Sequence, residues 1–236
     1  MRTTYTLAKC KNCNTHLHSL FETLDPKETS LLNEHKSCSF YKKNQIIFSQ
    51  NSQAHVLYII CSGKVKLYQL SENGREQIVR MANAGDILGY RALLSNDRYT
   101  SSAETIEEAN ICVIPKEFFF NLMAKNPSIT AHLMRILSDD LKKAEHKITD
   151  LAQKPVRERM AEAILFIKET YGYEKDNATI NVVLTREELA NIVGTATETA
   201  IRLLSELRQE HLIDFIGKKI KILNHARLTE LANVND

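Results

Sequence analysis

Five cysteines are the side chains of this 236-residue chain best suited to metal or redox chemistry. Cys10 and Cys13 form a CxxC pair, and His16 and His18 follow closely. Thiolates and imidazoles at this spacing are typical zinc ligands. Because polar residues interrupt the N-terminus too early for a secretory signal, we expect a cytoplasmic protein without disulfides. Metal binding, redox chemistry and simple burial remain open for the cysteines.

A second chemically suggestive pair lies near the other end of the chain. Glu198 and Arg202 are four residues apart, which places them on one face of a helix. Arginine can bond the O6 and N7 edge of guanine, and glutamate can accept from cytosine N4. Two structural roles compete with DNA reading. Glu198 also completes a capping box that starts at Thr195, and Arg202 could pair with Glu198 or Glu206.

The surrounding pattern predicts a winged helix-turn-helix. A capping box opens a helix at Thr185, Gly194 ends that helix, and a second helix starts within a few residues. A hairpin with the basic tip 217–219 follows. Because the first turns of a recognition helix enter the major groove, we expect base contacts from its N-terminal residues and phosphate contacts from nearby basic or hydroxyl groups. The base-reading candidates are Thr197, Glu198 and Arg202, and the phosphate candidates are Arg186, Thr195, Lys218 and Lys219.

Residues 40–115 show short β-rich runs with regular turn signals, which predicts an antiparallel barrel or jelly roll. Asn73-Gly74 is the strongest hairpin signal, and a type I′ turn there requires positive φ at both residues. Asn51 stands in a turn where asparagine tolerates the left-handed conformation. Cys38 and Cys61 are interpreted as small buried hydrophobes, because Cys61 ends a strongly apolar run.

A long helix is predicted over 127–154, and Pro155 ends it. Apolar residues recur at spacings of 3 and 4 and form a narrow seam, which favours a partner helix in a homodimer over packing on the chain's own barrel. The seam consists of Met134, Leu137, Leu141, Ala144, Ile148 and Leu151.

Composition excludes several classes of protein. With 43% hydrophobic and 25% charged residues, the chain is typical of globular proteins and not of disordered ones. The longest apolar stretch, around Phe118–Phe120, is far too short for a membrane span. Residues 155–236 hold 11 Lys and Arg against 13 Asp and Glu, so DNA binding there would need a local cationic face.

Several motifs, in this order and spacing, resemble the Crp/Fnr family of bacterial transcription regulators. The resemblance spans about Phe21 to Leu231 and is carried by Ser62-Gly63-Lys64, 74–77, 85–89, 112–115, 184–186 and 194–202. It implies an α+β fold with an N-terminal segment over 1–20, a cyclic-nucleotide-binding-like β-roll over 21–126, a dimerisation helix over 127–154 and a winged helix-turn-helix over 155–236. It also implies double-stranded DNA, a second copy of the chain and RNA polymerase as partners, the last through the region of the polar loop 172–178.

The resemblance also shows departures that bear on the effector. Members that bind cyclic nucleotides carry Glu after the glycine of the roll and an Arg-Ser pair further on. This chain has Tyr90 after Gly89, and the later positions hold Ser101 and Ser102. Burying a cyclic phosphate without a cation is costly, and only Arg91 lies nearby in sequence. Cyclic AMP is therefore not expected, and the roll would take another small-molecule or redox effector, or none. Thr197 replaces an arginine of the cyclic-AMP-responsive members, which favours a target site of the Fnr type.

Cys112 stands where Fnr-like oxygen sensors place their distant cluster ligand. Those sensors need a further cysteine after the CxxC pair, and this chain has His16, His18 and Ser19 there. Three hypotheses stay open: an iron–sulfur cluster on Cys10, Cys13 and Cys112, zinc on the N-terminal cysteines and histidines, or no metal.

The sequence thus predicts a homodimeric DNA-binding regulator that reads a pseudo-palindromic site. The alternative is a cyclic-nucleotide-binding or metal-binding β-roll module without sequence-specific DNA reading. An oxygenase-type enzyme is not expected, because His55 is the one histidine among the predicted strands.

Overall fold

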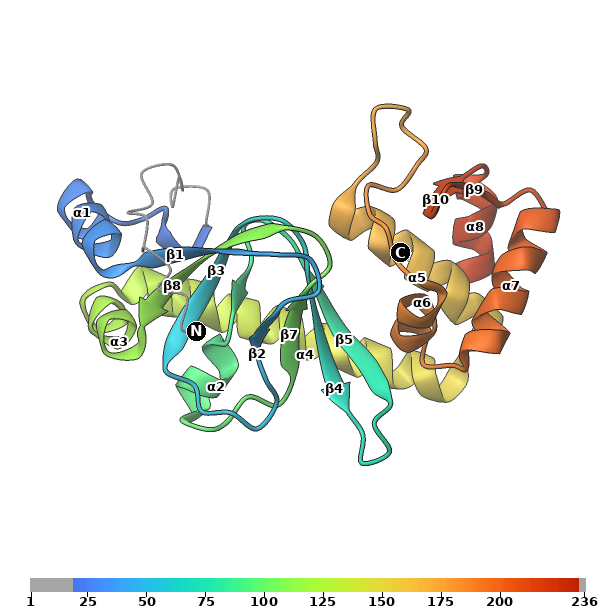
Figure 1. Cartoon of the computed structure of the whole chain (residues 1–236). Helices are drawn as coiled ribbons and strands as arrows, with labels where there is room; N and C mark the ends of the chain where they lie inside the picture. The colour runs from blue at the N-terminus through green and yellow to red at the C-terminus, as the bar shows by residue number, and fades with distance from the viewer. Residues whose placement is uncertain (1–18, 234–236) are drawn as a thin grey trace, which may run out of the picture. The chain divides into compact units, whose positions relative to one another are not determined.

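The computed structural model describes residues 19–233 and is shown in Figure 1. It forms two compact units. The first comprises the residues up to Gln69 together with Ala82–Leu141, and the second comprises Leu70–Met81 together with the chain from Lys142 onward.

The N-terminal part of the chain forms a β-roll of two four-stranded antiparallel sheets, all of whose strands except β5 lie mainly in the first unit; this confirms the predicted α+β fold. Branched and aromatic residues in the 56–115 region alternate with turn residues, and this pattern produces the short strands. One sheet has the order β1 (Ser37–Tyr41), β8 (Ala109–Pro115), β3 (Val56–Ser62), β6 (Ile87–Leu88). The other has the order β2 (Ile46–Phe48), β7 (Ser102–Thr105), β4 (Val65–Leu70), β5 (Glu76–Ala82).

Short helices accompany the roll, and a continuous apolar core fills it. The helical segments are η2 (Ser19–Phe21), α1 (Pro26–His35), α2 (Tyr90–Ser95) and α3 (Lys116–Lys125). Asp25 caps α1 in a complete capping box with Glu28. Leu57, Ile59 and Ile111 are fully buried between these elements.

The loop between β4 and β5 differs from the predicted turn. Gly74 has φ of 73°, but Asn73 is not among the described residues with positive φ. The amide of Gly74 donates to the carbonyl of Ser71 at 2.9 Å, and the Ser71 hydroxyl accepts from the amide of Arg75 at 3.1 Å. A turn closed in this way needs only one left-handed residue, so the prediction for Asn73 was wrong. Asn51 does adopt the left-handed conformation, with φ of 66°.

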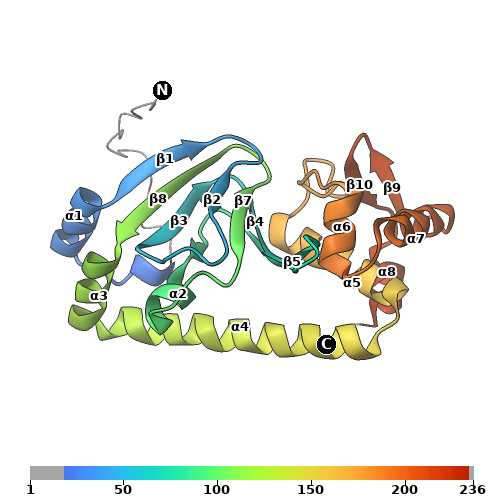
Figure 2. The same cartoon turned by 60° about the horizontal axis from the view of Figure 1, so that its bottom comes forward.

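The long helix α4 (Pro127–Gln153) is uninterrupted, as Figure 2 shows. Pro127 suits the first turn, no glycine or proline follows inside it, and Pro155 ends the pattern. Ile129 and Leu133 are buried near its start.

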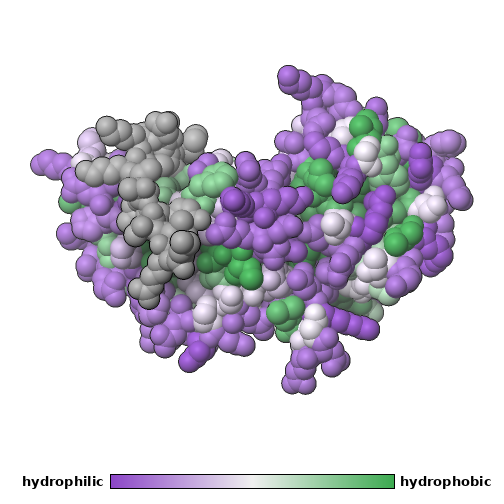
Figure 3. All heavy atoms as spheres, in the orientation of Figure 1, coloured by the Kyte–Doolittle hydropathy of each residue, from purple (hydrophilic) through white to green (hydrophobic). Residues whose placement is uncertain are grey.

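The second unit holds the winged helix-turn-helix. Its elements are α5 (Val156–Tyr171), α6 (Arg186–Val193), α7 (Thr197–Gln209), β9 (Ile213–Ile216), β10 (Lys219–Ile222) and α8 (His225–Ala232). The face drawn in Figure 3 is mainly hydrophilic, with hydrophobic residues in small areas. Among the described helices, none combines the length and the apolar character that crossing a membrane requires.

Candidate nucleic-acid interface and cysteine cluster

The first helix of the motif, α6, is fixed at both ends by local sequence. Thr185 and Glu188 form a reciprocal capping box, with the Glu188 amide 3.0 Å from the Thr185 hydroxyl and the Thr185 amide 2.8 Å from Glu188 Oε2. Gly194 ends the helix in the left-handed conformation at φ of 74°. A Cβ at Gly194 would lie 3.1 Å from Leu151 and 3.4 Å from Gln77, so both the φ and the tight packing favour glycine.

The second helix, α7, buries one face and exposes the other. Ala200, Leu203, Leu204 and Leu207 form the buried stripe. Glu198, Ile201 and Arg202 are exposed, and Ser205 extends the same face by one turn. Ser205 was missed in the sequence, although its spacing of seven residues from Glu198 places it on this face.

The predicted capping box at Thr195 does not form. Ala196 is the N-cap of α7, and no side chain caps this end. The turn holds Thr195 one position before the cap, because its amide donates to the carbonyl of Ala190 at 3.1 Å. Glu198 therefore has no capping role, and the helix start presents its first amides without a side-chain partner.

The charged candidates have local partners. Arg202 Nη1 lies 2.5 Å from Glu206 Oε1, while 64% of the Arg202 side chain stays exposed. The Arg186 guanidinium stacks 4.0 Å from the centroid of the Phe215 ring in the wing. That partial burial lowers the pKa of Arg186 through loss of hydration.

The wing is tied to the loop that follows α5. Lys219 forms an ion pair with Glu174, and Ile180 donates its amide to the carbonyl of Ile220 at 2.9 Å. Asp176 accepts from the Thr179 hydroxyl at 2.6 Å and from the Thr179 amide at 2.8 Å. These bonds lower the pKa of Asp176 to about 2. Lys218 is exposed at the hairpin tip.

A buried arginine that sequence reasoning missed holds the turn of the motif. Arg159 is 9% exposed, and its guanidinium donates to the carbonyls of Leu151, Lys154, Val193 and Gly194 at 3.0–3.5 Å. These carbonyls lie at the C-terminal ends of α4 and α6, where a cation is favourable to the helix dipoles. The sequence gives no signal for this role, because two of the four acceptors lie more than 30 residues away along the chain.

The predicted seam of α4 is largely exposed. Met134, Leu141 and Ile148 have exposed fractions of 65%, 61% and 68%. Ala144 is also exposed, and Leu151 is 42% exposed. Leu137 differs, because it packs in part against the core of the first unit.

Most of the residues predicted to line an effector pocket are buried or engaged in structural contacts. Gly89 caps α2 at φ of 81°, and Tyr90 is buried with its hydroxyl donating to Asp140 on α4. Ser101 is buried, the Ser102 hydroxyl accepts from the Gln50 amide at 2.9 Å, and Arg91 is exposed. The position of the missing carboxylate thus holds a phenol that points to α4.

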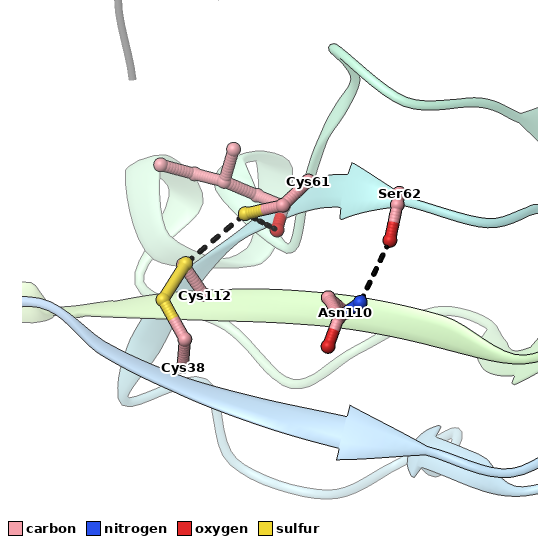
Figure 4. The surroundings of a disulfide bond; sticks show 6 residues. Cys38, Cys61, Ser62, Asn110 and Cys112 are labelled. Carbon is pink, nitrogen blue, oxygen red and sulfur yellow. Dashed lines mark hydrogen bonds between the residues drawn. A yellow bond between two sulfur atoms is a disulfide. The ribbon is translucent and has the colours of Figure 1, made fainter. Parts of the chain in front are cut away.

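Three cysteines of the roll lie together, which corrects two expectations. Cys38 on β1 forms a disulfide with Cys112 on β8, and Cys61 on β3 lies 3.0 Å from Cys112, sulfur to sulfur (Figure 4). The prediction of no disulfide was wrong, because the pairing of β1 with β8 sets Cys38 directly opposite Cys112. Cys38 and Cys61 were expected to be buried but are only partly buried. The three sulfur atoms lie within 4.8 Å of one another, a spacing that could hold a metal ion when the cysteines are reduced. The other candidate ligands, Cys10, Cys13, His16 and His18, lie outside the described residues.

Comparison with known proteins agrees with this architecture. Residues 38–126 match the model of the cyclic nucleotide-binding domain, and residues 158–231 match the Crp-like helix-turn-helix domain. The fumarate and nitrate reduction regulatory protein of Vibrio cholerae is 34% identical, over 82% of this chain and 78% of its own length. Regulatory protein HlyX of Actinobacillus pleuropneumoniae is 31% identical, over 93% and 92% of the two chains. FixK2 from Bradyrhizobium japonicum shares the fold, with a TM-score of 0.77 at 23% identity over 85% of this chain and 99% of that chain.

A β-roll followed along the chain by a long helix and a winged helix-turn-helix defines a class of DNA-binding transcription regulators. This chain belongs to the Crp/Fnr family of that class. Family membership confirms the resemblance and the expectation that the protein is not an enzyme.

Proposed function

We propose that the protein is a homodimer that reads a pseudo-palindromic DNA site with α7. The observation that carries this proposal is the two-faced character of α7, with one stripe buried and Glu198, Ile201 and Arg202 exposed in its first turns. A guanidinium there can pair with guanine, and an apolar side chain such as Ile201 can contact a thymine methyl. Arg186, Thr195, Lys218 and Lys219 remain the proposed phosphate contacts, with Lys218 as the most accessible cation of the wing.

The exposed seam of α4 supports the homodimer. Met134, Leu141 and Ile148 expose large apolar side chains at heptad spacing, and a second copy of the helix would bury them. Two α7 helices related by a two-fold axis would then read half-sites about one helical turn apart.

The effector is proposed to differ from cyclic AMP. Tyr90 replaces the carboxylate that would hold the ribose, and its hydroxyl is engaged by Asp140. The names of two relatives, fumarate and nitrate reduction regulatory protein and anaerobic regulatory protein, support a response to oxygen supply. The iron–sulfur set suggested by the resemblance remains a prediction. In this structure Cys112 is bonded to Cys38, so a thiolate ligand there requires reduction of that bond first.

RNA polymerase is the proposed protein partner. The loop 172–178 is held against β10 by the ion pairs of Glu174 with Lys219 and of Asp176 with Lys221, so it presents an ordered surface.

Two variants test the DNA-reading proposal. If Arg202 pairs with a guanine, Arg202→Ala should cost about 1–3 kcal/mol on the specific site. Duplexes altered at that guanine should bind the wild type and the variant almost equally. Lys218→Ala is the matched control. It should weaken specific and nonspecific DNA alike and lower the salt slope by about one unit.

A uniform loss for Arg202→Ala on every duplex would contradict base reading and would leave Arg202 as the partner of Glu206. Binding that never exceeds the nonspecific level would favour the alternative of a β-roll module without sequence-specific reading.

A further inference from the structure

Three adjacent strands bring the three roll cysteines to one place. β8 lies between β1 and β3 in the sheet, and Cys112 is paired with Cys38 on one side and with Ile59 on the other. Cys61 follows Ile59 by two residues, so its side chain lies on the same face of the sheet. Figure 4 shows the sulfur of Cys112 between those of Cys38 and Cys61.

A β-bulge helps to place Cys61. The pairing of β3 with β8 shifts between Ile60 and Ser62, which leaves Cys61 as the extra residue. Bulges commonly re-aim a side chain next to a functional site. Here the Cys61 sulfur lies 3.0 Å from Cys112 Sγ and also contacts the carbonyl of Ile59 at 3.8 Å.

The spacing of the sulfur atoms suits a metal centre once the disulfide is reduced. Metal–sulfur bonds of about 2.3 Å in a tetrahedral site separate the ligand sulfurs by about 3.8 Å. The three sulfurs lie within 4.8 Å of one another, and the Cys61–Cys112 distance of 3.0 Å is shorter than the tetrahedral value. Small side-chain rotations would therefore bring all three to coordination distance.

Burial fits the same role. Cys112 is fully buried, whereas Cys38 and Cys61 are partly exposed. Its strand partner Ile59, on the same face of the sheet, is also fully buried. An apolar shell limits access of water to a thiolate-bound metal, while the partly exposed flank gives an entry path.

We propose that Cys38 and Cys61 join Cys112 as thiolate ligands of one thiophilic metal centre in the β-roll. The inference deepens the proposed function and rests on it, because the centre would be the signal-sensing site of the regulator. Two molecules of a thiol reductant convert the Cys38–Cys112 disulfide into two thiols and leave as one disulfide. Each cysteine then releases its proton as its sulfur binds the metal.

Metal content of the full-length protein tests the proposal. The protein is purified without oxygen in dithiothreitol, and iron, acid-labile sulfide and zinc are measured per chain. The wild type should carry either iron with sulfide or zinc at a stoichiometric level, and that result identifies the centre. Cys38→Ser and Cys61→Ser should each lower the metal content at least several-fold, as should Cys112→Ser.

Cobalt provides a second readout that does not depend on retention during purification. Charge-transfer absorbance from thiolate to Co²⁺ scales with the number of sulfur ligands, so each single variant should lose the contribution of one thiolate. Ser39→Ala, on β1 beside Cys38, is the matched control and should keep the full signal. Circular dichroism verifies that each variant is folded. If a serine variant is not folded, the alanine variant at the same position, Cys38→Ala or Cys61→Ala, replaces it in the test.

The proposal would be overturned if a folded Cys38 or Cys61 variant kept full metal content and full cobalt absorbance. It would also be overturned if the fully reduced wild type bound no iron, zinc or cobalt. Failure of the proposed function gives a different result. In that case the protein would bind no DNA specifically at any metal content, whereas failure of the metal site would leave a metal-free protein that still binds its DNA site.

Discussion

Replacing Arg159 should loosen the helix-turn-helix more than any surface arginine of the same unit. Arg159→Met keeps the apolar stem of the side chain and removes the guanidinium that bonds four carbonyls at the ends of α4 and α6. The change leaves these carbonyls without their charged donor and removes a cation from two helix C-termini.

The expected loss can be bounded from these contacts. Hydrogen bonds to a charged group contribute about 1.5–3 kcal/mol each, but the four here share one guanidinium and two are longer than 3.2 Å. Breaking a buried charged network typically costs about 3–5 kcal/mol, and the partly exposed helix ends can recover some bonds to water. We therefore expect the opening free energy of α6 and its turn to fall by about 2–4 kcal/mol.

Hydrogen exchange followed by mass spectrometry measures this loss locally. Amides of α6 should exchange about 30- to 700-fold faster in the variant, because each 1.4 kcal/mol is about tenfold. Arg157→Met is the matched control on the same helix. Arg157 pairs with Glu210 at 2.6 Å, but its side chain is 38% exposed, so its loss should cost at most about 1 kcal/mol. Equal exchange rates in α6 for the two variants would refute the assigned role of Arg159.

Three further predictions concern the dimer, the effector and the loop beside the wing. Leu141→Glu would set two carboxylates in the proposed seam and cost several kcal/mol if both stayed charged, so sedimentation should show a monomer at micromolar concentration; an intact dimer would mean that the seam is not the interface. Cyclic AMP should give no saturable heat in calorimetry even at millimolar concentration, whereas micromolar affinity would contradict the assignment based on Tyr90. The lowered pKa of Asp176, about 2 against an ordinary 3.8, means that the carboxylate stabilises its loop above pH 3.8 and that this contribution disappears as the pH falls through about 2. An NMR titration of Asp176 should have its midpoint near 2, and a midpoint near 3.8 would show that the bonds to Thr179 do not persist in solution.

The sequence allowed prediction where the signal is local. The two helices of the motif follow from apolar spacing, from the capping box at Thr185 and from Gly194, and the strands of the roll follow from β-rich runs between turns. The prediction of a cap at Thr195 was wrong, because α7 begins one residue later than expected. Ala196 therefore takes the N-cap position. The predicted type I′ turn at Asn73 was wrong. The Gly74 amide bonds the Ser71 carbonyl instead, and this turn needs a left-handed conformation at Gly74 but not at Asn73.

What could not be predicted depends on contacts between distant segments. The cysteine cluster requires the order β1, β8, β3, which places residues more than 70 positions apart in register. Arg159 likewise finds acceptors 34 and 35 residues away. No short-range pattern carries this information, because it is the tertiary fold that brings these groups together.

Selection from random DNA duplexes tests the central claim most directly. The purified full-length protein is incubated with a random library at moderate salt, and bound duplexes are enriched and sequenced. We predict a two-fold pseudo-palindrome whose half-sites lie about one helical turn apart. The same selection with Arg202→Ala should lose its preference at one guanine of each half-site. Enrichment of no motif, or of a single asymmetric half-site, would contradict the account of this protein as a dimeric, sequence-specific regulator.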